Sequence, residues 1–124
     1  MRPTRRELLV AILQGQGAEV RAVASAAAAI EALRDPQFRP DVLVSDVGMP
    51  GTDGFALVRE MRSMSAEKFR SLPAIAVTAY VNPEDRVRAL VAGYQNHLPK
   101  PVDPDALAEA IVQLVSRHAP RNSA

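Results

Sequence analysis

The sequence predicts an α/β domain in which a parallel sheet is covered by helices on both faces. Helix-like and strand-like patterns alternate along the chain, as they do where helices join parallel strands. Two segments, residues 42–44 and 74–77, are unbroken apolar runs, which is typical of strands buried on both faces. The length of 124 residues suits one such domain with a single core.

Five helices are predicted from apolar residues that recur at helical spacing between residues that favour helix ends. Ser25 can cap the second helix, and Gly93 can end the fourth. The helices are expected at about residues 4–15, 25–33, 54–61, 82–93 and 103–115.

Four strands are predicted, at about residues 19–23, 42–44, 74–77 and 94–98. The run at 42–44 is expected in the centre of the sheet, because it is apolar on both faces. Pro99 follows the last strand and indicates an edge strand, since proline cannot donate a backbone hydrogen bond to a neighbour.

Composition excludes several kinds of protein. The absence of cysteine rules out disulfides, thiolate chemistry and zinc ribbons. A net charge of +1 without a basic stripe argues against a nucleic-acid partner. No apolar segment approaches the roughly 20 residues that span a bilayer, so we expect no membrane partner and a cytoplasmic location.

The segment that follows the run at 42–44 is the most informative one. It places Asp46, Met49, Pro50, Asp53 and Gly54 in the pattern Asp-x-x-Met-Pro-x-x-Asp-Gly. Together with Val-Thr-Ala at 77–79 and Leu-Pro-Lys-Pro at 98–101, this pattern resembles the receiver domain of two-component response regulators, over residues 3 to about 115. The resemblance implies a flavodoxin-like (CheY-like) three-layer sandwich. The sequence of residues 98–102 most resembles that of the terminal receivers of hybrid sensor histidine kinases.

The resemblance also assigns roles to five residues. Asp46 would be the phosphoacceptor, Thr78 the switch hydroxyl, and Lys100 a contact to the carboxylate or phosphate. The backbone N–H of Ala79 would donate to the phosphoryl group, and the backbone carbonyl of Gly48, with Asp46, would bind Mg²⁺. Taken alone, three of these residues have plainer interpretations. Asp46 could simply lie between a strand and a turn, Thr78 could be an ordinary β-branched strand residue, and Lys100 could be a surface lysine.

Two departures from the family pattern stand out. The family's switch aromatic, three residues before the lysine, is replaced by His97, whose imidazole is smaller and titrates near neutral pH. The family's first strand and the acidic pair at its end are also missing, because the sequence begins too late to contain them. We therefore expect weak Mg²⁺ binding and slow or absent phosphorylation, since one carboxylate makes a poor magnesium site.

The missing strand also bears on folding. Burying about four aliphatic side chains contributes roughly 6–12 kcal/mol, comparable with the whole stability of a domain. We expect that the natural protein is longer, or that a partner segment or an element exchanged in a homodimer fills the gap. The predicted domain covers residues 1–117 without its first strand, and residues 118–124 are expected to form a disordered tail.

Two functions follow from these expectations. In the first, a histidine kinase or histidine phosphotransfer protein donates a phosphoryl group to Asp46. In the alternative, the chain is a pseudo-receiver, a protein-interaction module that is not phosphorylated because the acidic pair is missing. We expect no enzyme, because the sequence has neither a glycine-rich phosphate loop after a strand nor a nucleophile elbow.

Overall fold

The protein is described from a computed structural model that covers residues 5–46, 54–64, 66–78, 83–99 and 102–118. Three parallel strands form one sheet in the order β1-β2-β3. The strands are β1 (Leu43–Asp46), β2 (Ala74–Thr78) and β3 (Asn96–Pro99). The helices are α1 (Arg5–Gly15), α2 (Ala26–Arg34), α3 (Gly54–Ser63), α4 (Glu67–Ser71), α5 (Pro83–Ala92) and α6 (Pro104–His118).

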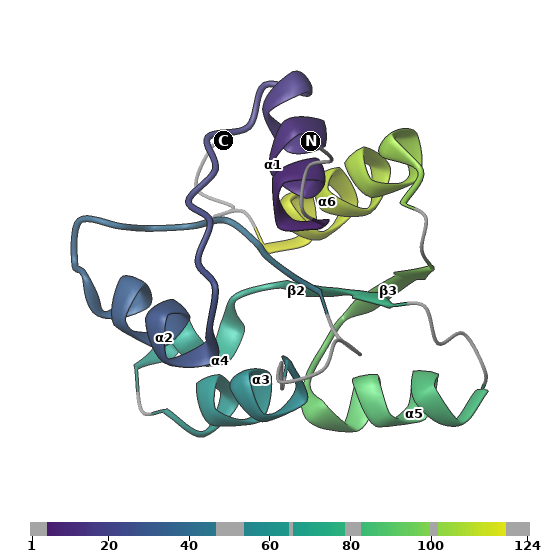
Figure 1. The fold of residues 1–124 in the computed structure, drawn as a ribbon. Coiled ribbons are helices and arrows are strands. Elements are labelled where there is room, and N and C mark those ends of the chain that lie inside the picture. The colour runs from purple at the N-terminus through teal and green to yellow at the C-terminus, as the bar shows by residue number, and fades with distance from the viewer. Residues whose placement is uncertain (1–4, 47–53, 65, 79–82, 100–101, 119–124) are drawn as a thin grey trace.

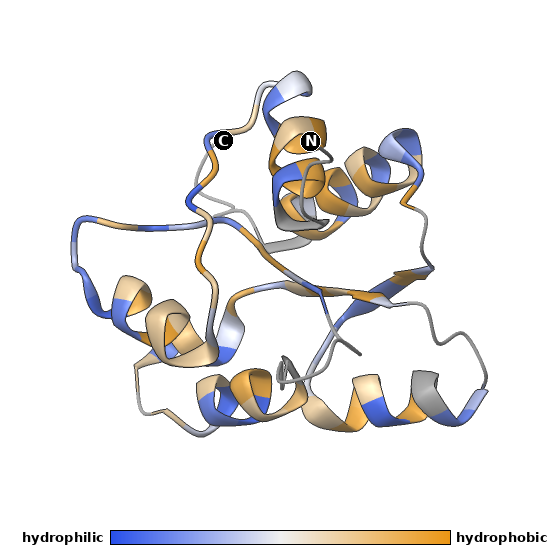
Figure 2. Ribbon diagram, viewed as in Figure 1, coloured by the Kyte–Doolittle hydropathy of each residue, from blue (hydrophilic) through white to orange (hydrophobic). Residues whose placement is uncertain are grey.

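The helices form one layer on each face of the sheet. Figure 1 shows α1 and α6 on one face, with α2, α3, α4 and α5 on the other. This arrangement confirms the predicted α/β sandwich with a parallel sheet and helices on both faces. Apolar residues of both helix layers pack against the sheet, in one cluster with Ala76 and in another with Ile75. Figure 2 shows β2 in apolar colours.

The core is centred on β2, whose five residues are all buried. Ile75 faces α6 and packs with Leu107 and Leu114, while Ala74 and Ala76 face the opposite layer and pack with Val58. Because successive side chains of a strand point to opposite faces, one apolar run serves both layers. The interpretation of residues 74–77 as a strand buried on both faces is confirmed.

Arg62 joins several elements near the amino end of the sheet. Its guanidinium donates to the carbonyl of Gly93 from Nε (3.1 Å) and Nη2 (2.8 Å), and from Nη1 to the carbonyls of Phe69 (3.2 Å) and Arg70 (3.1 Å). Nη2 also donates to Oε1 of Gln95 at 3.1 Å. Burial lowers the pKa of Arg62, and the charge interaction with Tyr94 opposes that shift. The carbonyls that end α4 and α5 thus share one cation, as helix dipoles favour.

Several expectations about individual elements are corrected by the structure. Residues 19–23 do not form a strand, because a strand needs a hydrogen-bonded neighbour and this segment has none in the described sheet. Consequently β1 lies at an edge rather than in the centre, and its Leu43 and Val44 are only half-buried. The short helix α4 was not predicted.

Helix α6 reaches His118, one residue beyond the predicted domain boundary, while the rest of the expected tail lies outside the described residues. The last strand is at an edge, as Pro99 indicated.

Candidate functional site at the carboxyl end of the sheet

The described site residues lie at the carboxyl ends of two neighbouring strands. Asp46 is the last residue of β1, and Thr78 is the last residue of β2. In the parallel register Asp46 is paired with Val77, directly before Thr78. Since both strands run in the same direction, the acid and the hydroxyl residue reach the same end of the sheet, where α/β proteins usually bind ligands.

Burial differs between these two residues. Asp46 is half-buried, with its carboxylate oxygen Oδ1 shielded from solvent, whereas Thr78 is buried at 5% exposure. The carboxylate therefore combines partial exposure with a fixed backbone, which a nucleophile at a strand end requires. The Thr78 side chain is part of the packed interior beside it.

Three predicted site residues, Gly48, Ala79 and Lys100, lie outside the described residues. The backbone next to Lys100 is described, because Pro99 ends β3 and is paired with Thr78. The chain that carries the predicted lysine therefore leaves the sheet next to the strand end that carries Thr78. The structure thus brings together the ends of all three strands that were predicted to build the site.

The described residues contain no group of three or more His, Cys, Asp or Glu side chains that could hold a metal ion. Among the residues of the three strands, Asp46 is the one acid. Magnesium prefers octahedral oxygen ligation that usually includes one or two carboxylates together with phosphate and water. The described donor set does not by itself form a magnesium site.

His97 lies in β3, paired with Ala76 of the central strand. Its ring is half-buried, and Nε2 is shielded from solvent. The residue that replaces the family's switch aromatic is therefore packed at the edge of the described sheet.

Comparison with known proteins decides the family. The family model described as "Response regulator receiver domain" matches residues 2–112, which is most of the chain. The chain belongs to the response regulator receiver family. This receiver is 42% identical over 111 residues to an uncharacterised 14.6 kDa protein of Leptolyngbya boryana, covering 90% of this chain and 82% of that one. It is 33% identical over 112 residues to the sensor protein GacS of Pseudomonas syringae, covering 90% of this chain and 12% of GacS.

Solved structures of receivers agree with the fold. The receiver domain of a signal transduction histidine kinase from Syntrophus aciditrophicus superposes with a TM-score of 0.80 at 32% identity, covering 99% of this chain and 90% of that one. The receiver of the sensor histidine kinase PA1611 from Pseudomonas aeruginosa, solved with magnesium in its active-site cleft, gives a TM-score of 0.75 at 28% identity, covering 88% and 86% of the two chains. The resemblance to receivers, including those of hybrid kinases, is therefore confirmed.

The sequence did not predict the hydrogen-bond network at the amino end of this receiver's sheet. The network of Arg62, Gly93 and Gln95 fixes the opposite end of the sheet through bonds that span up to 33 residues of sequence. An arginine directly after the fully buried Met61 was the available signal.

In the described part of the chain, every helix is too short or too polar to traverse a lipid bilayer.

Proposed function

We propose that this receiver accepts a phosphoryl group on Asp46 and relays a two-component signal. The observation that carries the proposal is the placement of Asp46 and Thr78 at the carboxyl ends of adjacent parallel strands, in a chain of the receiver family. A half-buried carboxylate on a rigid strand end can act as a nucleophile toward phosphorus without a large change in backbone structure.

The reaction is a transfer from a phosphohistidine. A carboxylate oxygen of Asp46 attacks phosphorus, the new O–P bond forms as the donor's N–P bond breaks, and the bonding electron pair stays on the imidazole nitrogen. Charge on the three phosphoryl oxygens must be offset in the transition state. The hydroxyl of Thr78, the backbone N–H of Ala79 and the ammonium of Lys100 are the proposed groups for this role, as family resemblance implies.

The proposed donor is a histidine kinase or a histidine phosphotransfer protein. This assignment rests on relatives such as GacS, of which the chain spans a small part, and on the Dictyostelium discoideum hybrid signal transduction histidine kinase D. A cytoplasmic location belongs to the same proposal, because such donors draw their phosphoryl group from ATP. No nucleic-acid partner is proposed.

Magnesium is expected to bind weakly in this chain. Asp46 and the backbone carbonyl of Gly48 would be its ligands, and a single carboxylate gives low affinity. Since the described residues do not complete a magnesium site, we propose slow transfer to Asp46 rather than rapid transfer.

The test is intact-protein mass spectrometry after incubation with acetyl phosphate and Mg²⁺. We expect a slowly forming adduct of about 80 Da, the mass of one phosphoryl group, which is absent in Asp46→Asn. Asp41→Asn is the matched control, because Asp41 is an exposed acid just before β1 and should leave the adduct unchanged. Rapid, stoichiometric modification would contradict the proposed weak metal site.

The second candidate is the pseudo-receiver. The observation that favours it is the lack of a three-ligand cluster among the described residues. If the folded protein forms no adduct, even at high concentrations of donor and Mg²⁺, the phosphoacceptor proposal fails and the interaction module is the better description.

A further inference from the structure

Helix α5 is apolar on the face that points away from the sheet. The residues that it buries on the opposite face are small, Ala89 and Ala92. Its outward side chains are larger: Val87 is 58% exposed, Leu90 64% and Val91 79%. A surface helix normally carries polar side chains on its outer face. The outer face of α5 is instead composed like one that packs against another element.

These three outward side chains form one patch, the outer patch of α5. Val91 follows Val87 by four residues and Leu90 follows it by three, and these spacings place side chains on one side of a helix. Elsewhere in the described chain, exposed large apolar side chains occur singly, as Leu8 of α1 and Val112 of α6. In Figure 1 no described element covers α5 on the side away from the sheet. Contiguous apolar groups of this kind mark contact surfaces, whereas single ones are ordinary.

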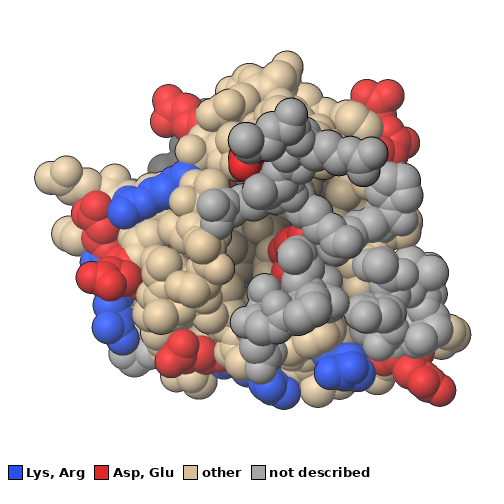
Figure 3. All heavy atoms as spheres, in the orientation of Figure 1, with Lys and Arg blue, Asp and Glu red and all other residues tan. Residues whose placement is uncertain are grey.

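Two opposite charges border the outer patch. Glu84 and Arg88 are exposed and four residues apart, so they follow the same stripe of α5 as Val87 and Val91. Arg88 leans toward α3, since its guanidinium lies 4.9 Å from the ring centroid of Phe55. Acidic and basic side chains both appear at the lower right of Figure 3, where α5 runs in Figure 1. The patch therefore has an acid and a base on its border, separated by one helical turn.

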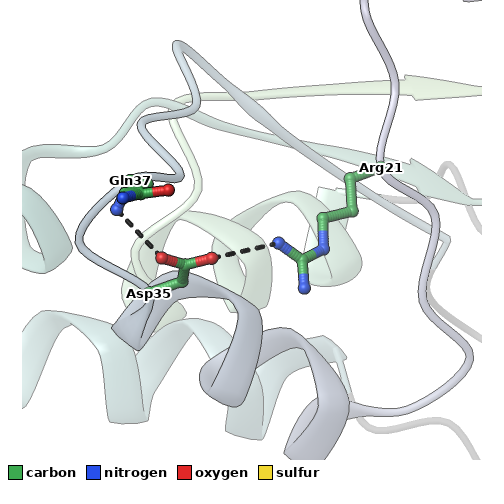
Figure 4. Close-up of polar contacts among 3 residues, drawn as sticks. All are labelled: Arg21, Asp35 and Gln37. Carbon is green, nitrogen blue, oxygen red and sulfur yellow. Dashed lines mark hydrogen bonds and ion pairs between the residues drawn. The ribbon is translucent and has the colours of Figure 1, made fainter.

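An arginine that is held over an aromatic ring can bind a carboxylate at the same time. Arg21 does so in this protein: it lies 4.9 Å from the ring centroid of Phe38 and 3.8 Å from the carboxylate of Asp35. Figure 4 shows that carboxylate between Arg21 and Gln37, whose N–H it accepts at 2.9 Å. The ring restricts the guanidinium, so less side-chain entropy is lost when the ion pair forms. Arg88, with a ring contact of the same length, is prepared for a carboxylate in the same way.

The order of these groups makes the outer face of α5 complementary to itself. When two identical helices lie antiparallel across a two-fold axis, each residue before the axis faces one that follows it on the other copy. An axis close to Val87 brings Val87 beside its symmetry mate and Glu84 of one copy within reach of Arg88 of the other. Because the symmetry repeats each contact, two ion pairs border one apolar seam. A second copy of the chain thus matches both the apolar and the charged groups.

We propose that α5 is a self-association surface, on which two copies of this chain pair through antiparallel helices. The side chains of Val87, Leu90 and Val91 form the seam, and ion pairs between Glu84 and Arg88 border it. A helix of ten residues is about 15 Å long, so the contact covers less than the roughly 1,200 Å² of a stable complex. Association is therefore weak and reversible, with a Kd between about 10 μM and 1 mM. The pairing does not depend on phosphoryl transfer.

The first experiment is sedimentation equilibrium from about 20 μM to 1 mM. The average mass should rise with concentration from 13.4 kDa toward twice that value and no further, because a two-fold contact closes at the dimer. Val87→Lys should weaken association at least about tenfold without destabilising the fold, since lysine favours helix more than valine does. Val112→Lys, with the same charge change at an exposed site of α6, should associate normally.

Three results of this experiment overturn the proposal: a chain that is monomeric at about 1 mM, unchanged association in Val87→Lys, or an equal loss in Val112→Lys. Co-sedimentation of a monomeric chain with lipid vesicles, abolished by Val87→Lys, would assign the outer patch to a membrane surface and also overturn it. Asp46→Asn should associate as the unaltered protein does, so failure here is distinct from failure of phosphoryl transfer.

The second experiment reverses the two charges. Glu84→Arg or Arg88→Glu alone places like charges across the seam and should weaken association by about tenfold. The double variant Glu84→Arg/Arg88→Glu restores opposite charges without changing the net charge, and its Kd should return to within about fivefold of the original. Circular dichroism checks the helix, because the reversal removes an acid from its first turn. A folded double variant that associates no better than the single variants overturns the antiparallel pairing.

The third experiment tests the two-fold axis by cross-linking, since the chain contains no cysteine. In oxidised glutathione, Val87→Cys should form a disulfide-linked dimer at least about fivefold faster than Val112→Cys, because two β-carbons must approach to about 4 Å. Val91→Cys, which lies away from the axis, should react more slowly than Val87→Cys. Equal rates in all three variants, or the fastest reaction in Val112→Cys, overturn the proposal.

Discussion

The amino end of the sheet is fixed by side-chain hydrogen bonds, whereas the carboxyl end holds the acid and the hydroxyl proposed for signalling. At the amino end, Oε1 of Gln95 accepts from the N–H of Ala74 at 2.7 Å, and Arg62 joins Gln95 to Gly93. At the carboxyl end, Asp46 is only half-buried. Substitutions at the two ends should therefore separate stability from function.

The largest expected effect is that of Gly93→Ala at the amino end. Gly93 has φ +119°, and an added Cβ would lie 2.8 Å from Cγ of Arg62 and 3.0 Å from Cγ1 of Val58. We expect a loss of about 2–4 kcal/mol in the free energy of unfolding, because backbone strain and overpacking both contribute. Urea denaturation followed by circular dichroism measures it.

Two other glycines separate these contributions. Gly17 has φ +89° with no atom within 4 Å of an added Cβ, so Gly17→Ala should show the strain alone, about 1 kcal/mol. Gly15 also has open space and no positive φ, so Gly15→Ala should be neutral or stabilising by up to about 1 kcal/mol. If Gly93→Ala and Gly17→Ala lower the free energy of unfolding equally, the close approach of Gly93 to Arg62 contributes nothing to the destabilisation.

Arg62→Met should have the next largest effect. Methionine keeps much of the apolar stem but removes every donor to Gly93, Phe69, Arg70 and Gln95. We expect a loss of about 2–3 kcal/mol, since partly buried carbonyls lose their partners. Arg59→Met, at an exposed site of the same helix, should change stability by less than about 0.5 kcal/mol.

The loss in Arg62→Met should not depend on pH near neutrality. Burial lowers the pKa of Arg62 in the folded state, so the unfolded state binds that proton more tightly. Stability from this group would therefore rise with pH only near the guanidinium pKa, far above neutrality. A strong pH dependence of the Arg62→Met effect between about pH 6 and 8 would show that another titrating group is coupled to Arg62.

These amino-end residues also show where sequence reasoning stops. The helices other than α4, and the strand β2, could be predicted because their signals are local: Ser25 caps α2 by accepting from the N–H of Ala28 at 3.1 Å, and apolar spacing marks the buried faces. The bonds from Arg62 to Gly93 join residues 31 positions apart, which no local pattern reveals.

Pairing of strands is equally non-local. Residues 19–23 have strand-like composition, but strand formation depends on a neighbour, and the described sheet offers none. Residues 42–44 were apolar enough for a central strand, yet β1 lies at the edge for the same reason. For the site, the order of motifs predicted which strand ends meet, because parallel strands bring their carboxyl ends to one side.

Gln95→Leu should have a moderate effect at the amino end. The substitution leaves the N–H of Ala74 and one Arg62 bond without their acceptor, and we expect a loss of about 1–2 kcal/mol. Gln95→Glu is the matched variant, because a carboxylate accepts both bonds and adds an opposite charge beside Arg62. It should be neutral or slightly stabilising in urea denaturation. Equal losses in both variants would show that packing of the side chain, rather than its oxygen, supports this end.

The smallest effect on stability is expected at the carboxyl end, in Asp46→Asn and Thr78→Val. Each keeps the size and shape of the native side chain, and Asp46 is only half-buried, so we expect changes of about 1 kcal/mol or less. The functional effects should differ sharply from this: Asp46→Asn should lose phosphoryl acceptance completely, and Thr78→Val should still form the adduct but more slowly. Urea denaturation and the acetyl phosphate assay, applied to the same samples, give both numbers. If instead either variant destabilises the protein as much as Gly93→Ala does, the carboxyl end is a structural element of the fold, and the division between a rigid end and a reactive end is wrong.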